Sequence, residues 1–208
     1  MQAAVLGQSP LRPALHAADG APLLTSNPTL QASLERIARG SSLWREAFEA
    51  LRGTRRTVLV VTPDQVVVAD TPDGETGRPF DPAVLAAVAP IPRQDSQVRE
   101  VLVVVNLPLI QEIHDRRRSL AIELDMDVDR ILVHEVYGHA LPYLLAGDLS
   151  GRCADPAPGQ PASEACSVRR ENAVRAELRL GRRTEYGLDG LWLARTGSTY
   201  ENPFYRRF

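Results

Sequence analysis

The chain has 208 residues, enough for one domain with a substantial core, and its 44% hydrophobic and 24% charged residues are typical of a soluble globular protein. The formal net charge of −2 gives no electrostatic basis for binding nucleic acid. No apolar run approaches the roughly 20 residues of a membrane-spanning helix, and the N-terminus lacks the basic start and long apolar core of a Sec-type signal peptide.

All 24 basic residues are arginine, and the chain contains no lysine. Codon usage in a GC-rich genome explains this bias. A protein that works inside a eukaryotic cell would also gain from it, because it offers no side-chain amine for ubiquitination. Cys153 and Cys166 could pair, but they do not have the spacing of a zinc knuckle, and we expect two free thiols.

The N-terminal third predicts a leader followed by helices. Residues 1–26 are rich in Ala, Pro, Gln and Ser without a sustained period, so we expect a flexible leader before a single domain over 27–208. A first helix is predicted from the cap Asn27-Pro28 to Gly40, and a second from Ser41 or Ser42 to Gly53. The two would form a helical hairpin over the core.

The middle of the chain predicts a small sheet. The β-branched runs Thr57–Thr62 and Gln65–Asp70 flank Pro63-Asp64, which predicts a β-hairpin. The other expected elements are a short helix from Asp81-Pro82 to Pro90, a buried strand at Glu100–Leu107, a helix at Pro108–Arg118, and an ambiguous segment at Ser119–Leu124 that could be the edge strand at which a substrate is bound.

The segment His134-Glu135-Val136-Tyr137-Gly138-His139 carries the clearest chemistry. A neutral imidazole is a good zinc ligand, and a carboxylate beside a zinc-bound water can accept its proton. Zinc proteases usually carry H-E-x-x-H, whereas this chain has one residue more. In a regular α-helix, positions five apart point about 140° away from each other. A π-type turn would return both rings to one side.

Two residues favour such a distortion in the helix that we expect from about Val128 to before Gly147, with Asp127 as its N-cap. Gly138 weakens the helix, and Pro142 removes an N–H donor and clashes with the carbonyl of Gly138. The sequence therefore predicts a loosely wound turn that directs His134 and His139 at one zinc ion.

A third zinc ligand is expected from the helix Glu164 to Leu180, which ends at Gly181. Glu164, Val168, Glu171 and Arg175 form a single stripe on it, and two carboxylates two turns apart cannot both bind one metal. A tight antiparallel helix pair favours Glu171, whereas an early end at Pro142 favours Glu164.

This arrangement resembles the glutamate-type zincins, particularly type III-secreted zinc-protease effectors and related bacterial toxin domains, whose plan is similar to that of the clostridial neurotoxin light chains. The resemblance covers about residues 128–186 and rests on His134, Glu135, the second histidine and the downstream glutamate. In that plan the third ligand matches Glu164. The five-residue histidine spacing departs from it, but the H-E-x-x-G-H motif is similar to that of the dipeptidyl-peptidase III family. Val174-Arg175-Ala176-Glu177 matches only the end of that family's third-ligand motif.

The chemistry and the resemblance together imply an α+β, zincin-like fold, with a small mixed sheet, a zinc-binding helix and a following glutamate helix. The implied function is zinc-dependent hydrolysis of a protein or peptide, with Glu135 as general base. Tyr186 and Arg175 are candidates for stabilising the oxyanion, although packing and salt-bridge roles also suit them. The C-terminal tail, 182–208, is expected to pack over the site.

Three hypotheses follow. The first is an endopeptidase effector or toxin that leaves the bacterium without a Sec signal peptide and cleaves a host protein. The second is a non-catalytic effector or interaction module with a closed structural zinc or none, for which Cys153, Cys166 or Asp148 could supply a fourth ligand. The third is a housekeeping cytoplasmic peptidase.

Overall fold

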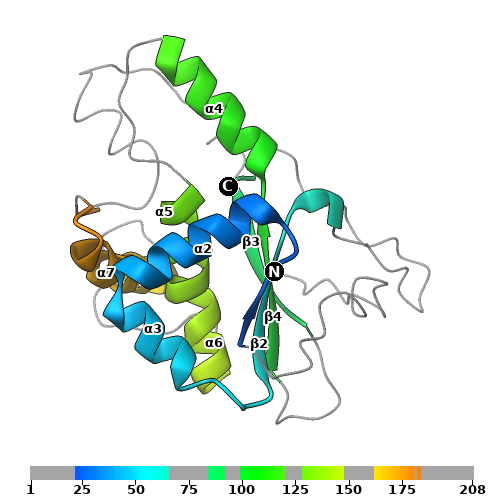
Figure 1. Cartoon of the computed structure of the whole chain (residues 1–208), viewed down its shortest axis with the longest axis vertical. Coiled ribbons are helices and arrows are strands. Elements are labelled where there is room, and N and C mark those ends of the chain that lie inside the picture. The colour runs from blue at the N-terminus through cyan, green and yellow to red at the C-terminus, as the bar shows by residue number, and fades with distance from the viewer. Residues whose placement is uncertain are drawn as a thin grey trace.

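The computed structural model describes residues 22–65, 84–91, 99–119, 128–147, 162–180 and 182–183. Over these residues the chain is a mixed α+β protein with a small four-stranded sheet and a group of helices (Figure 1). The strand order is β1-β2-β4-β3, where β1 is Leu23–Leu24, β2 is Arg56–Val61, β3 is Ala86–Ile91 and β4 is Arg99–Val105. The first three strands in that order run parallel, and β3 runs antiparallel to β4.

The two central strands are apolar on both faces, as expected for buried parallel strands. Val58 and Val60 of β2 share one face with alternate residues of β4 and join the main core, which the helices complete. Val61, Leu102, Val104 and Ile91 form a second buried cluster on the opposite face. The prediction of a strong buried strand near residues 100–107 is confirmed by β4.

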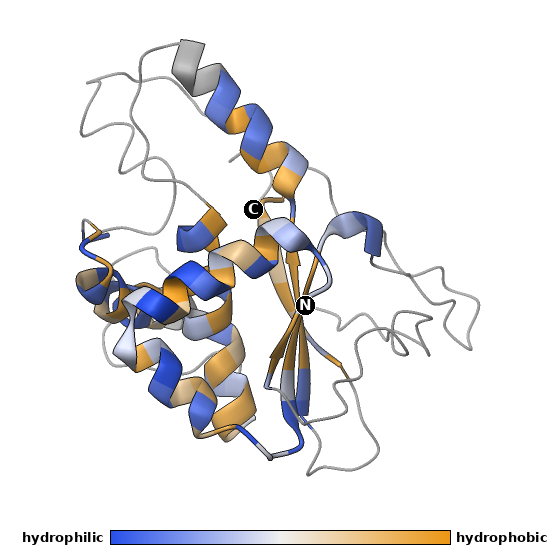
Figure 2. Ribbon diagram, viewed as in Figure 1, coloured by the Kyte–Doolittle hydropathy of each residue, from blue (hydrophilic) through white to orange (hydrophobic). Residues whose placement is uncertain are grey.

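Most of the helices lie on one side of the sheet in Figure 1. They are α2 (Pro28–Gly40), α3 (Ser42–Glu49), the continuous run of α5 (Val128–Leu132), π-helix η2 (Val133–Ala140) and α6 (Leu141–Ala146), and α7 (Ala162–Glu177). Figure 2 shows that these helices turn apolar faces inward, and α4 (Leu107–Ser119) extends away from the sheet. Among the described residues, no helix is long and apolar enough to cross a membrane.

The predicted helical hairpin is confirmed. The side chain of Asn27 accepts hydrogen bonds from the amides of Thr29 and Leu30 and so caps α2, and Ser41 caps α3 through the amide of Trp44. Gly53, with φ of +74°, follows α3 in the left-handed conformation that glycine tolerates best.

Glu177, at the end of α7, ties that helix to the start of α3. Its carboxylate accepts hydrogen bonds from the hydroxyls of Ser41 and Ser42 and from the amide of Leu43. The bonds from Ser41 and then Ser42 hold the pKa of Glu177 below its ordinary value. These contacts help to fix α7 relative to the helical hairpin.

Two elements differ from the prediction. The proposed hairpin of Thr57–Thr62 with Gln65–Asp70 is wrong at Val58 and Leu59, which pair on both edges with the parallel neighbours β1 and β4; residues 66–70 lie outside the described part. The predicted helix closed by Pro90 is also wrong, since residues 86–91 form strand β3. Proline is acceptable there because β3 is at the edge of the sheet, where an absent N–H need not break the ladder.

Other elements begin or end a few residues away from their predicted bounds. Leu23–Leu24 pair with Val58 and Leu59, so ordered structure begins before Asn27, inside the expected leader. The helix expected over Pro108–Arg118 is confirmed as α4, and the one expected to reach Leu180 ends at Glu177. Cys166 is buried and disulfide-bonded, so the expectation of free thiols is wrong for this residue.

Candidate metal and catalytic site

The predicted distortion of the motif helix is confirmed. The segment Val133–Ala140 is a π-helix between two α-helical segments, and it contains both histidines. The backbone amide of Leu141 donates to the carbonyl of Val136, five residues back. The carbonyl of Gly138, to which Pro142 cannot donate, accepts a hydrogen bond of 3.1 Å from Nη1 of Arg170 in α7.

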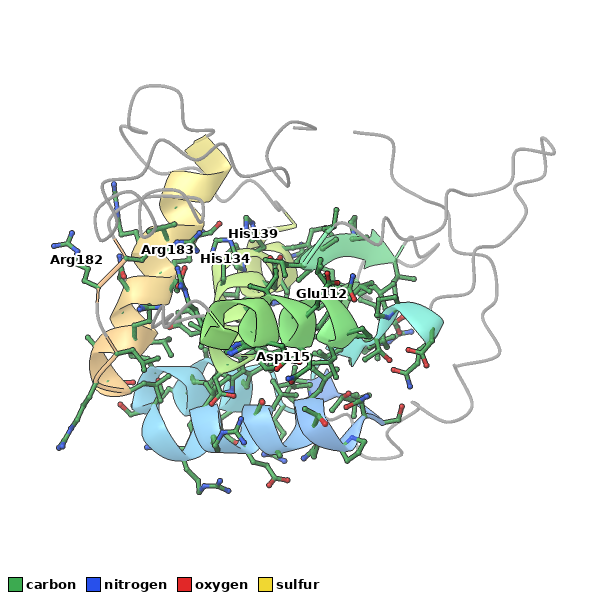
Figure 3. The ribbon with its side chains drawn as sticks, turned by 90° about the horizontal axis from the view of Figure 1, so that it is seen from above. Glu112, Asp115, His134, His139, Arg182 and Arg183 are labelled. Atoms are coloured by element: carbon green, nitrogen blue, oxygen red, sulfur yellow. The ribbon has the colours of Figure 1, made fainter. Side chains whose placement is uncertain are left out.

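The π-helix brings the two imidazoles together. The ring centroids of His134 and His139 are 5.0 Å apart, and the rings are nearly perpendicular, at 84°. His134 is buried and His139 half-buried. Figure 3 shows the two rings side by side, with Arg183 close to His134. An undistorted α-helix would direct the same side chains about 140° apart.

Helix α7 places a carboxylate against one of these rings. Oε2 of Glu171, a fully buried side chain, lies 3.0 Å from Nδ1 of His134. Three guanidinium groups surround the same carboxylate: Arg183 donates to Oε2 at 2.8 Å, Arg175 donates to Oε1 at 3.2 Å, and Nε of Arg130 lies 3.5 Å from Oε1. Glu171 is therefore the centre of a buried network of charges.

The ionisation of Glu171 follows from these contacts. Burial alone would raise the pKa of this carboxyl group. The hydrogen bond with His134 and the positive charge of Arg183 act in the opposite direction and lower the pKa to about 2. Glu171 is thus a carboxylate at neutral pH, and its oxygens can only accept hydrogen bonds.

The second histidine has its own contact with α7. Oγ of the buried Ser167 lies 3.1 Å from Nδ1 of His139. Ser167 stands one helical turn before Glu171, so two successive turns of α7 each contact one of the two histidines. The helices meet closely here, because a Cβ at Gly138 would lie 3.0 Å from Cβ of Ser167 and 3.2 Å from its Cα and carbonyl oxygen.

Replacing Gly138 by alanine tests this contact. Helix propensity alone predicts a gain of about 1 kcal/mol for alanine. Because the added methyl group must displace the backbone of α7, we expect the free energy of unfolding to fall by about 1–3 kcal/mol, measured by urea denaturation. In the matched variant Gly40→Ala, the new Cβ meets only the end of the Leu178 side chain, so the loss should be smaller. A Gly138→Ala protein at least as stable as the unmodified one would contradict close packing at this position.

The other residues predicted for the site have different outcomes. Glu135 is half-buried on the π-helix, beside His134. Arg175 is buried and forms a salt bridge with Glu171, one of the roles expected for it. Glu164 lies in the first turn of α7, but its side chain is outside the described part of the structure, as are Tyr186, Cys153, Asp148 and Asp127. Arg183, the second residue of the expected tail, does reach the site.

Three contributors were not predicted. Arg130 and Ser167 stand four residues before His134 and Glu171, so extending each helix stripe by one turn would have found both. Arg183 follows the end of α7 and has no such periodic signal. It is fixed by Asn172, whose side chain accepts from the amide of Arg183 at 2.8 Å and donates to its carbonyl at 2.7 Å.

Within the described residues, no three His, Cys, Asp or Glu side chains form a single metal-binding group. The site thus consists of a π-helical imidazole pair, an adjacent carboxylate in Glu135, and two contacts from α7 to the rings. A comparison of the chain with protein-family models, curated proteins and solved structures found no match.

Proposed function

We propose that the protein is a zinc-dependent endopeptidase, with His134 and His139 as metal ligands and Glu135 as the general base. The observation that carries this proposal is the π-helix, which brings two histidines five residues apart onto one side of the helix. Such π-helical turns are uncommon and occur frequently at functional sites.

The spacing of the rings fits a shared zinc ion. Zinc binds imidazole nitrogen at about 2.0–2.1 Å, and the ring centre lies roughly 1.1 Å beyond that nitrogen, so two imidazoles at a tetrahedral angle would have centroids about 5 Å apart. The separation of the His134 and His139 centroids is 5.0 Å. A catalytic zinc takes a further protein ligand, for which α7 offers the carboxylates of Glu164 and Glu171.

Each residue then has a defined task. Zinc, when bound, would polarise the scissile carbonyl and activate a water molecule. The carboxylate of Glu135, next to a ligand, would accept the proton of that water and transfer it to the leaving amine. Arg130, Arg175 and Arg183 hold Glu171 in place through their charges.

The proposed substrate is a protein of a host cell. Two features support this part of the proposal. The chain has no lysine, which would protect it from ubiquitination inside a eukaryotic cell. Cys166 is disulfide-bonded, which suits a protein that spends time outside a reducing cytoplasm before it reaches its substrate.

A second candidate is a non-catalytic interaction module in which the same residues serve only the fold. The contacts of Glu171 favour it, because His134 and three arginines already satisfy this carboxylate without a metal. Such a protein would bind no zinc at the imidazole pair and would hydrolyse no peptide.

Removal of the metal separates the two candidates. The purified full chain should contain about one zinc per molecule and cleave members of a fluorescence-quenched peptide library. A chelator such as 1,10-phenanthroline should abolish that cleavage, and added zinc should restore it. A protein that binds no zinc, or whose peptide cleavage survives complete removal of the metal, is not the proposed enzyme.

A further inference from the structure

The contacts between α7 and the π-helix form a repeated pattern. Two residues one turn apart on α7, Ser167 and Glu171, each approach the Nδ1 atom of one histidine, at 3.1 and 3.0 Å. Both α7 side chains are fully buried. The close packing of Gly138 against Ser167 sets the distance between the π-helix and α7 beside the two histidines.

For His134, the direction of the hydrogen bond follows from charge. The carboxylate of Glu171 can only accept, so Nδ1 must carry the proton and donate it. Nη1 of Arg183 also lies 3.4 Å from this Nδ1, but Arg183 can only donate, and it has a shorter contact of 2.8 Å with Oε2 of Glu171. Both groups therefore donate to the same carboxylate oxygen. In this tautomer of His134, Nε2 holds the ring's basic lone pair.

For His139, the hydroxyl of Ser167 can accept the Nδ1 proton as Glu171 does for His134. It can accept from Nδ1–H while donating its own proton to a carbonyl of the preceding helical turn. Ser167 has no exposed surface, so it cannot reach a substrate as a nucleophile. Its distance to Nδ1 is instead that of an orienting contact, of the kind that fixes the tautomer of metal-binding histidines.

We infer that Ser167 and Glu171 are positioning residues that hold the Nδ1 atoms of His139 and His134, so that both rings present Nε2 to the metal. This inference rests on the proposed function and refines it: Glu171 acts through His134 and is not itself a ligand. The third ligand is then another residue, with Glu164 the remaining candidate on the same helix.

The tautomers can be measured directly by NMR. In the metal-free full chain labelled with ¹⁵N-histidine, two-bond ¹⁵N–¹H spectra distinguish a proton on Nδ1 from one on Nε2. The chain has four histidines, and the variants His134→Gln and His139→Gln assign the two signals. We expect both rings to carry a proton on Nδ1, as the two contacts from α7 require. A ring protonated on Nε2 and not on Nδ1 would overturn the inference for that ring.

Zinc affinity, measured by competition with a chromophoric chelator, gives the second readout. Ser167→Ala and Glu171→Gln should each weaken zinc binding by about 10–100-fold, the loss typical of an orienting partner. The Ser167→Ala variant should also shift the signal of His139 while leaving that of His134 in place. Ser33→Ala, which removes a buried serine from α2, a helix that carries none of the residues of the site, is the matched control and should leave affinity unchanged.

Failure of this inference and failure of the proposed function are distinguishable. If zinc binds tightly but Ser167→Ala changes neither affinity nor the His139 signal, Ser167 has no positioning role and the enzyme proposal stands. If Glu171→Gln abolishes zinc binding altogether, Glu171 is a direct ligand. If the protein binds no zinc while both rings carry protons on Nδ1, the orienting contacts are real and the proposed function is wrong.

Discussion

Replacing Glu135 by glutamine is expected to abolish peptide hydrolysis and to leave zinc in place. Glutamine has nearly the shape of glutamate but cannot accept a proton at neutral pH, so the water would lose its general base. General bases contribute about 10²- to 10⁴-fold to rate, and we expect kcat/KM to fall by that factor in assays with a quenched peptide substrate. Zinc content should stay near that of the unmodified protein, because Glu135 is not among the proposed ligands.

A surface glutamate provides the control for that experiment. Glu49 is exposed and paired only with Arg52 among the contacts described for it, so Glu49→Gln should change neither kcat/KM nor zinc content. Retention of full activity by Glu135→Gln would remove Glu135 from its catalytic role. A simultaneous loss of zinc and activity would indicate that Glu135 supports the metal site instead of acting on the water.

Truncation of Glu171 should have the largest effect on stability. Its fully buried carboxylate is the shared partner of Arg130 and Arg175, whose side chains are only 4% and 3% exposed, and of Arg183. Removal of one partner from a buried ion pair costs about 3–5 kcal/mol, because a charge is left in the interior without compensation. We therefore expect Glu171→Ala to lower the free energy of unfolding by about 3–5 kcal/mol in urea denaturation.

Two comparisons make that result specific. Glu35 is exposed and lies 3.9 Å from Arg39, so Glu35→Ala should change the free energy of unfolding by less than about 0.5 kcal/mol. In the double variant Glu171→Ala with Arg175→Met, one buried charge is removed together with its partner, and part of the lost stability should return. A loss below about 1 kcal/mol in Glu171→Ala would show that the arginines are adequately solvated or paired without it.

The parts of the fold that depend on local chemistry could be predicted from the sequence. Asn27-Pro28 and Ser41 carry their own capping groups, and β4 is an unbroken apolar run. The π-helix was predictable for the same reason, since the requirement for both histidines to face one way coincides with Gly138 and Pro142 on the same turn. These signals act within a few residues along the chain.

The failures in the sheet, and the omission of Arg183, concern partners that are distant in sequence. Residues 86–91 carry a proline typical of a helix end, and only the position of β3 at the edge of the sheet makes Pro90 acceptable in a strand. The hairpin prediction failed because the parallel neighbours of β2 come from residues 23–24 and 99–104. Arg183 reaches Glu171 only because the chain turns back after α7, which no periodic pattern records.

The sequence alone also left open whether Glu164 or Glu171 lies beside the histidines, because this depends on how two distant helices pack. Both lie on one stripe of α7, and the sequence could not determine which turn of that helix would meet the histidines. Packing at Gly138 and Ser167 determines it, and places Glu171 at Nδ1 of His134. A single serine has no chemical signature of its own, so only the spacing of Ser167, one turn before Glu171, could have pointed to it.

Anomalous diffraction at the zinc absorption edge, from crystals of the full chain grown with one equivalent of zinc, tests the central claim most directly. We expect one strong anomalous peak within about 2.0–2.1 Å of Nε2 of both His134 and His139. Zinc bound elsewhere, or at only one of these two rings, would contradict it.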